Sequence, residues 1–156
     1  METPEQAVTA LQKAIDRDGL SECMEQFNQL CDHGSAVIRP LLLMRNYHDN
    51  DDYLHEMYGV IHLVESFPPA TYFAELAKSI CDLRDSSPYL LWMLLVRIMN
   101  VRDENEAILF RSSIANLDEK TRRSLLSIVV DIQAHNTKNR ILVRCAAAIA
   151  ILNRSE

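Results

Sequence analysis

The sequence is poor in the residues that interrupt helices. Its 156 residues include only three glycines and five prolines, whereas sheets joined by tight turns need such residues often. No segment shows the strict alternation of apolar and polar residues that is typical of a half-buried strand. We therefore expect an all-α protein, and the length suits a single helical domain over residues 1–156.

Long apolar runs are also missing. The longest ones, at residues 89–96 and 146–152, are far shorter than the roughly 20 residues that a membrane span requires. The polar N-terminus has no basic segment leading into an apolar one, so we expect no signal peptide. The sequence thus predicts a cytoplasmic protein without membrane contact.

Motifs for metal binding and catalysis are missing as well. The four cysteines (Cys23, Cys31, Cys81 and Cys145) form no CxxC pair, so we expect buried thiols, with Cys23 and Cys31 on one helix face. GxSxG, GxGxxG, P-loop and HExxH sequences do not occur. These absences predict a protein that is not an enzyme and uses no cofactor.

Positive charge is scarce in the first half of the chain. Residues 1–70 hold 4 Lys and Arg against 12 Asp and Glu, whereas residues 71–156 hold 12 against 10. The acidic half would repel phosphates, so we expect no direct contact with nucleic acid. It suits a basic protein partner.

Capping signals divide the chain into about nine helices. Thr3-Pro4-Glu5-Gln6 is a capping box with proline at the first helical position, and Gly34 follows the second helix. The expected segments are residues 3–17, 21–33, 36–47, from 50 or 51 to 67, 71–84, 88–100, from 103, from 118, and from 137 onward.

Short connections between these helices predict antiparallel neighbours. The third and fourth, fifth and sixth, and seventh and eighth helices are expected to pair. We favour an irregular stack of helical hairpins resembling HEAT or armadillo arrays. A compact orthogonal bundle is the alternative.

Three histidines stand at seven-residue spacing in HDNDDYLHEMYGVIHLVESF, residues 48–67. His55 and His62 lie on the polar face of the expected helix, opposite Met57 and Ile61. Seven residues span about 10.5 Å of helix, too far for two ligands of one zinc ion. We expect no metal site, and a metal-dependent enzyme using His55 and His62 is a minor alternative.

Basic residues in the second half of the chain occur both in an apolar segment and on the last two expected helices. Arg97 lies with Trp92 in the most apolar segment, so we expect a core indole and a guanidinium that finds a carboxylate or carbonyl. Interleaved acids favour solvated faces over a phosphate-binding ridge for six others, namely Lys120, Arg122, Arg123, Lys138, Arg140 and Arg144.

Two stretches together resemble a known family. Ile61-His62-x-x-Glu65-Ser66-Phe67 is followed by Tyr72 and then by a proline-led helix that contains Trp92 and ends Arg97-Ile98-x-Asn100. This pattern resembles the immunity protein 30 family of bacterial polymorphic toxin and contact-dependent growth inhibition systems. The resemblance covers about residues 53–133, and leaves out the first fifty residues and the ninth helix.

The resemblance implies an immunity protein that neutralises a cognate toxin domain by direct binding, without catalysis. The acidic composition suggests a basic toxin such as a nuclease. The expected contact residues are Asp49, Asp51, Asp52, His55, Glu56 and His62. A competing acidic set is Glu5, Asp16, Glu22 and Glu25, and a helical scaffold for another protein or peptide is the alternative function.

Overall fold

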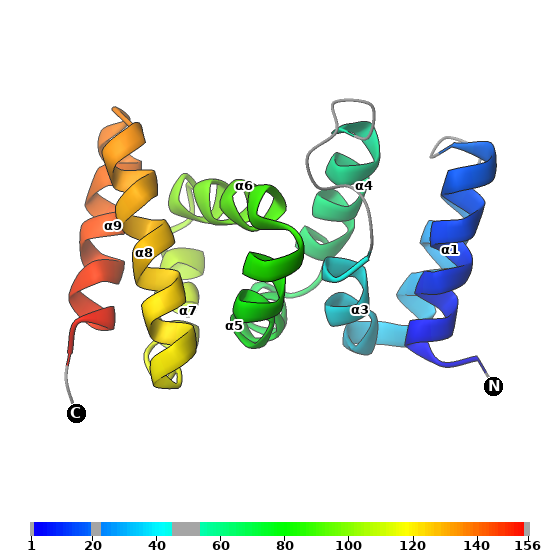
Figure 1. The fold of residues 1–156 in the computed structure, drawn as a ribbon, viewed down its shortest axis with the longest axis horizontal. Helices are drawn as coiled ribbons and strands as arrows, with labels where there is room; N and C mark the ends of the chain where they lie inside the picture. The colour runs from blue at the N-terminus through cyan, green and yellow to red at the C-terminus, as the bar shows by residue number, and fades with distance from the viewer. Residues whose placement is uncertain (1, 20–22, 45–53, 155–156) are drawn as a thin grey trace.

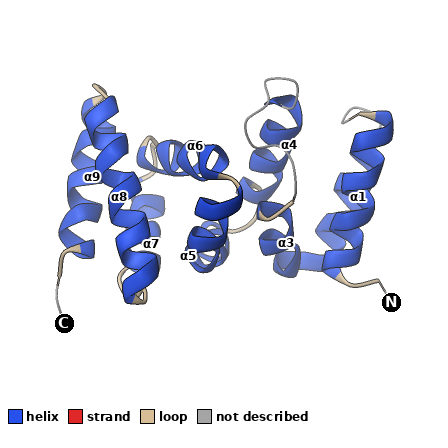
Figure 2. Cartoon of the chain, viewed as in Figure 1, coloured by secondary structure: helices blue, strands red, loops and turns tan. Residues whose placement is uncertain are grey.

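The computed structural model describes residues 2–19, 23–44 and 54–154, with only the backbone described at positions 24, 27 and 54–56. All regular structure in these residues is helical (Figure 2), so the all-α prediction is confirmed. No helix among them is long and apolar enough to cross a membrane. The helices follow one another along the long axis, and the two termini lie at opposite ends (Figure 1).

The N-terminal part contains α1 (Pro4–Asp18), α2 (Met24–Leu30), the 3-10 helix η2 (Cys31–Val37) and α3 (Ile38–Leu42). The capping box of α1 is present as predicted. The Gln6 N–H donates to Thr3 Oγ1 at 3.2 Å, and the Thr3 N–H donates to Gln6 Oε1 at 2.8 Å. These bonds satisfy donors that the first helical turn leaves unpaired.

Gly34 marks a break between the second and third helices, as predicted. Its φ of +59° and ψ of −150° are non-helical and form a kink within η2. Because 3-10 turns flank this kink closely, residues 23–42 form one kinked stretch, and the described residues therefore hold eight helical stretches instead of nine. A glycine tolerates positive φ, and 3-10 turns continue on both sides of it.

The kinked stretch also changes the environment of two cysteines. Cys23 is buried but Cys31 is exposed, so the prediction that both lie on one buried face is wrong. Eight residues at about 100° each place the two side chains about 80° apart around a helix, and Cys31 therefore lies off the face that buries Cys23. Of the other cysteines, Cys145 is buried and Cys81 is partly exposed.

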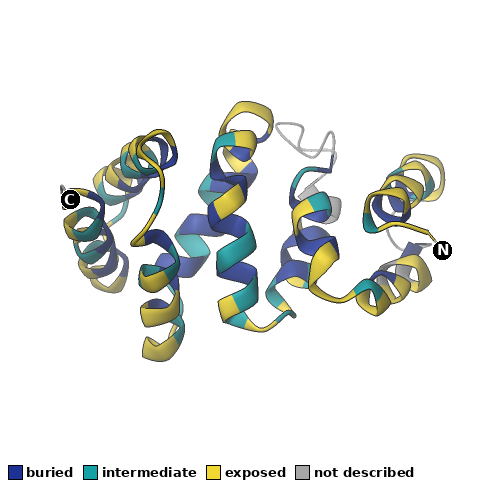
Figure 3. Cartoon of the chain, turned by 90° about the horizontal axis from the view of Figure 1, so that it is seen from below, coloured by how far each residue is buried: buried dark blue, intermediate teal, exposed yellow. Residues whose placement is uncertain are grey.

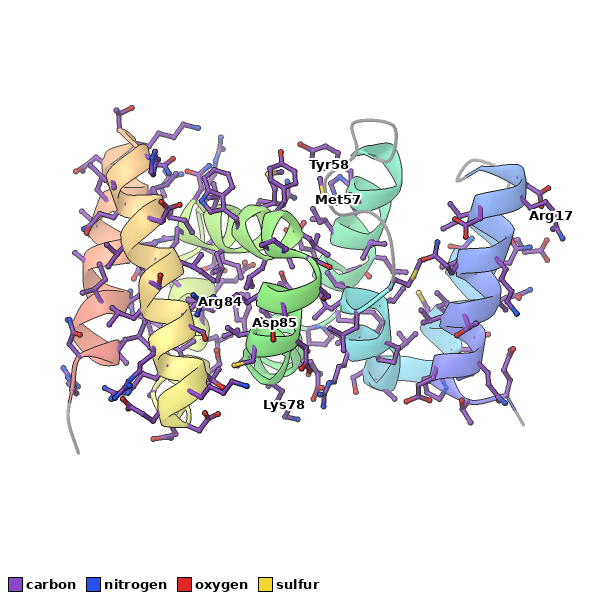
Figure 4. The ribbon with its side chains drawn as sticks, viewed as in Figure 1. Arg17, Met57, Tyr58, Lys78, Arg84 and Asp85 are labelled. Atoms are coloured by element: carbon purple, nitrogen blue, oxygen red, sulfur yellow. The ribbon has the colours of Figure 1, made fainter. Side chains whose placement is uncertain are left out.

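The fourth helix, α4 (Leu54–Glu65), carries the polar and apolar faces that the sequence predicts. Met57 and Ile61 are fully buried, and His62 is exposed. Met57 and Tyr58 project from α4 on the side of α6 (Pro88–Met99), as Figure 4 shows. The predicted start of this helix at Asn50 or Asp51 lies outside the described residues.

The remaining helices are α5 (Pro69–Ser86), α7 (Glu104–Ile114), α8 (Glu119–His135) and α9 (Asn139–Leu152). The predicted caps of α7 and α8 are confirmed. Asp103 accepts from the Asn105 N–H at 2.8 Å, and Asp118 accepts from the Thr121 N–H at 3.0 Å.

Two of the three predicted helix pairs are in contact, namely α3 with α4 and α5 with α6. The third is wrong, because α8 packs along α9 and α7 packs mainly against α5. Phe110 of α7 meets Phe73 of α5 edge to face, with ring centroids 5.6 Å apart. The helix α6 runs along the long axis, whereas α1, α4, α8 and α9 stand across it (Figure 1).

One continuous apolar core links these helices. It includes buried side chains from every described helix, such as Leu11 of α1, Leu76 of α5 and Ile141 of α9. Figure 3 shows the buried residues on helix faces that turn toward neighbouring helices. The core therefore fixes how the ends of α4, α5, α6 and α7 meet, which positions the site described next.

Candidate protein-interaction site

The predicted contact set lies largely beyond the described part of the chain. Asp49, Asp51 and Asp52 are outside the described residues, and so are the side chains of His55 and Glu56. His62 is described, and its side chain is 67% exposed on the polar face of α4. That exposure makes the imidazole accessible to a partner.

His62 is also one of the two histidines of the alternative metal site. Its Nδ1 lies 3.9 Å from Glu65 Oε2, a loose contact one helical turn along α4. Within the described residues, no three His, Cys, Asp or Glu side chains are placed to hold a metal ion. A metal ion held by His62 and Glu65 would therefore have no third ligand there, and the side chain of His55 lies outside the described residues.

Arg97 makes the strongest polar contact of this region. Its Nε donates to Glu65 Oε1 at 2.7 Å and its Nη2 donates to Glu65 Oε2 at 2.6 Å. This two-bond geometry joins the C-terminal ends of α4 and α6. The hydrogen bonds that Arg97 donates to Glu65 raise the pKa of Arg97, so the guanidinium stays charged. The predicted carboxylate partner of Arg97 is thus confirmed, and Trp92 packs partly buried against the core.

Tyr72, near the start of α5, lies beside this ion pair. The residue is only 3% exposed, and its buried hydroxyl has no hydrogen-bond partner among the described residues. Burial raises the pKa of Tyr72, and the nearby Glu65 raises it further. The phenol therefore keeps its proton and remains a potential donor.

A cavity of about 420 Å³ opens where α4 and α6 end and α5 and α7 begin. We call it the junction pocket. Its lining combines apolar groups with the charged side chains of four residues, Glu65, Arg97, Arg102 and Glu106, and with Tyr72. The volume lies within the roughly 300–1,000 Å³ usual for ligand pockets.

The rim of the junction pocket is held from α9. Arg144 is only 8% exposed; its Nη1 donates to the Val101 carbonyl, and its Nη2 donates to Glu104 Oε2 at 3.2 Å. Arg140 Nη1 donates to the Asn100 carbonyl at 3.4 Å. These contacts fix the loop between α6 and α7, which forms one side of the pocket.

The predicted solvated position of Arg144 is therefore wrong. The residue faces inward because the loop carbonyl and Glu104 supply the acceptors that a buried guanidinium needs. Arg122 and Arg123 both pair with Glu119 at the start of α8. The basic residues of the last two helices thus include several that are engaged within the protein.

The described part of α1 and α2 presents a surface of acidic side chains. Glu5, Asp16 and Glu25 are exposed, and none has a basic partner within residues 2–19, 23–44 and 54–154. Arg17 pairs with the adjacent Asp18 at 2.5 Å and projects outward from α1 (Figure 4). No direct ion pair therefore neutralises these three carboxylates, although Lys13 lines the same groove as Glu5 and Asp16.

Sequence reasoning identified His62 and the need of Arg97 for a partner. It missed Tyr72 as a donor, and it did not connect Arg102 or Glu106 with Glu65. The two segments that carry the family resemblance meet at the junction pocket, because Glu65, Tyr72 and Arg97 all line it.

Comparison with known proteins gives one match. The sequence model of a family described as Immunity protein 30 matches residues 2–108, which is more than half of the chain. The boundaries predicted for the resemblance were wrong at both ends, since the first fifty residues lie within the match and residues 109–133 lie outside it. The chain matches no curated protein and no solved structure.

Proposed function

The chain belongs to the immunity protein 30 family, and we propose that it neutralises a cognate toxin domain by binding it directly, without catalysing a reaction. The family match carries this proposal. It contains both the acidic surface of α1 and α2 and every residue that lines the junction pocket. We further propose that the toxin belongs to a polymorphic or contact-dependent growth inhibition system and is met in the cytoplasm.

The charge of the chain supports a nuclease as the target. The formal net charge is −6, and the excess of acidic residues lies in the first 70 residues. A nuclease must hold phosphates, so its substrate cleft is basic. An acidic protein surface is complementary to such a cleft, and attraction between the two speeds their association.

Two acidic sets are candidates for this contact. We propose as the first set the segment of Asp49, Asp51, Asp52, His55, Glu56 and His62, in which His62 is exposed. The second is the acidic set of Glu5, Asp16, Glu22 and Glu25, of which Glu22 lies outside the described residues. The charge-reversal experiment given in the Discussion separates the two.

Co-expression with the neighbouring toxin gene tests the proposal. Cells that make the toxin alone should stop growing, and cells that also make this protein should grow and yield a complex of the two proteins on purification. An unrelated acidic helical protein serves as the control for charge alone. Toxicity that persists although this protein is abundant and folded would contradict the proposed function.

A further inference from the structure

We propose that the junction pocket is an anchor site for a carboxylate group of the toxin, inserted where α4 and α6 end and α5 and α7 begin. This inference rests on the proposed function and deepens it. It adds one buried, directional contact to the long-range attraction between acidic and basic surfaces. The contact is made by Tyr72 and Arg97.

Within the described residues, the unused hydrogen-bonding groups of Tyr72 and Arg97 in the pocket are donors, whereas the carboxylate of Glu106 is an unused acceptor. Both oxygens of Glu65 already accept from Arg97. Arg97 uses Nε and Nη2 for these bonds, and its Nη1 has no acceptor among the described residues. The Tyr72 hydroxyl is likewise without a partner there. A ligand that completes these groups must bring an acceptor, and a carboxylate accepts from a guanidinium and a hydroxyl together.

The buried hydroxyl of Tyr72 is the observation that points to a ligand. A buried polar group without a partner destabilises the protein that contains it. Phenylalanine would fill the same space without that cost, so the hydroxyl has no evident role in the unbound fold. A carboxylate in the pocket would accept a hydrogen bond from this hydroxyl and remove the penalty in the complex.

The pocket is also prepared for binding before the ligand arrives. Arg97 is held by two hydrogen bonds to Glu65, and the loop on the rim is held by Arg144 and Arg140. Phe73 and Ile98 supply apolar lining that can cover the stem of an inserted side chain. Groups that are already fixed lose little conformational entropy on binding.

The charge of Glu106 offers a way to determine the sign of the ligand's charge. It lines the pocket from the first turn of α7, half buried, and has no basic partner among the described residues. Arg102 lies four residues earlier and also lines the pocket. A carboxylate ligand is repelled by Glu106 and attracted by Arg102, whereas a cationic ligand would experience the reverse.

The first test compares Tyr72→Phe with Tyr89→Phe, which removes a hydroxyl from an exposed tyrosine of α6 outside the pocket. Affinity for the purified cognate toxin is measured by calorimetry, and the stability of each free protein by urea unfolding. Tyr72→Phe should weaken binding about tenfold, as expected for losing a hydrogen bond to a charged group. Its urea midpoint should equal or exceed that of the wild type. Tyr89→Phe should change neither quantity.

The second test determines the charge and source of the inserted group. Glu106→Gln should bind the toxin severalfold more tightly, and weaker binding would show a cationic ligand and overturn the proposal. Each Asp and Glu of the toxin is changed to Asn or Gln, and its C-terminus is extended by one glycine. One change should lose at least as much affinity as Tyr72→Phe, because the carboxylate also contacts Arg97, and the two losses should not add.

Three results would contradict the inference. If Tyr72→Phe binds the toxin as well as the wild type does, the pocket is not an anchor, while neutralisation stands. If no toxin carboxylate is coupled to Tyr72, the inserted group is not a carboxylate. If the wild-type protein binds no toxin at all, the anchor and the proposed function fall together.

Discussion

At the scale of single residues, Arg97 shows how an ion pair can join two helices. The side chain sits in the most apolar helix, is 36% exposed, and makes two short hydrogen bonds to Glu65, whose side chain is 27% exposed. Partial burial strengthens the attraction, and the paired geometry satisfies both carboxylate oxygens. The pair therefore fixes the end of α4 against the end of α6.

A double-mutant cycle measures this coupling. Arg97→Met and Glu65→Gln, made singly and together, should give a coupling free energy of about 1–2 kcal/mol in urea unfolding. The matched control is the Arg39–Asp82 pair, which makes one hydrogen bond of 3.0 Å and is about half exposed. Arg39→Met and Asp82→Asn should couple by less than about 0.5 kcal/mol. A coupling of less than about 0.5 kcal/mol between Arg97 and Glu65 would contradict the proposed role of this ion pair.

The sequence predicted part of this site and could not predict the rest. An arginine in an apolar segment needs an acceptor, so a partner for Arg97 could be expected from local composition. Its identity could not, because Glu65 lies on a different helix 32 positions away. The unpartnered hydroxyl of Tyr72 also depends on packing between helices, and no local pattern marks it.

At the scale of helices, the ends were more predictable than the packing. Capping depends on residues within one turn, so Thr3, Asp103 and Asp118 could be recognised directly. The pairing of α8 with α9 depends on which apolar stripes match in three dimensions. The buried stripe of α8 includes Leu125 and Val129, and no sequence spacing distinguishes the packing of α8 on α9 from a pairing with α7.

The cap of α8 predicts a pH dependence. The hydrogen bonds from the Thr121 hydroxyl, at 2.6 Å, and from the Thr121 N–H lower the pKa of Asp118 below its ordinary value of 3.8. A carboxylate with a lowered folded-state pKa stabilises the fold above its unfolded-state pKa. This contribution is lost as the pH falls from about 4 through the folded-state value.

Asp118→Asn isolates that contribution. The wild type should have the higher urea midpoint at pH 7, and the difference should disappear as the pH falls below about 4. The two proteins are compared at a series of pH values in one buffer system. A difference that stays constant from pH 7 to pH 3 would mean that the charge of Asp118 does not stabilise the cap.

Helix α9 lies outside residues 2–108, which match the family, and we expect it to stabilise the rim of the junction pocket. Arg144→Met should lower the free energy of unfolding by about 2 kcal/mol, because a buried carbonyl and a carboxylate lose a charged donor. Arg140→Met, which removes one exposed bond of 3.4 Å, should cost less than about 0.5 kcal/mol. Urea unfolding measures both. Equal effects would indicate that Arg144 does not hold the rim.

At the scale of the whole molecule, the uneven charge should control the rate of association. Changing Asp51, Asp52 and Glu56 to Lys should slow toxin binding about tenfold at low salt while leaving the fold intact. Changing Glu5, Asp16 and Glu25 to Lys alters the net charge by the same amount on the other acidic set. Stopped-flow measurements at two salt concentrations compare them. If only the second variant slows binding, the partner contacts α1 and α2 instead.

The most direct test of direct neutralisation is a titration of toxin activity with the purified protein. The toxin is held at a concentration well above the dissociation constant of the complex. Its activity should then fall linearly and reach zero at one equivalent of this protein, with no other component present. Full toxin activity in the presence of a tenfold excess of folded protein would contradict the account.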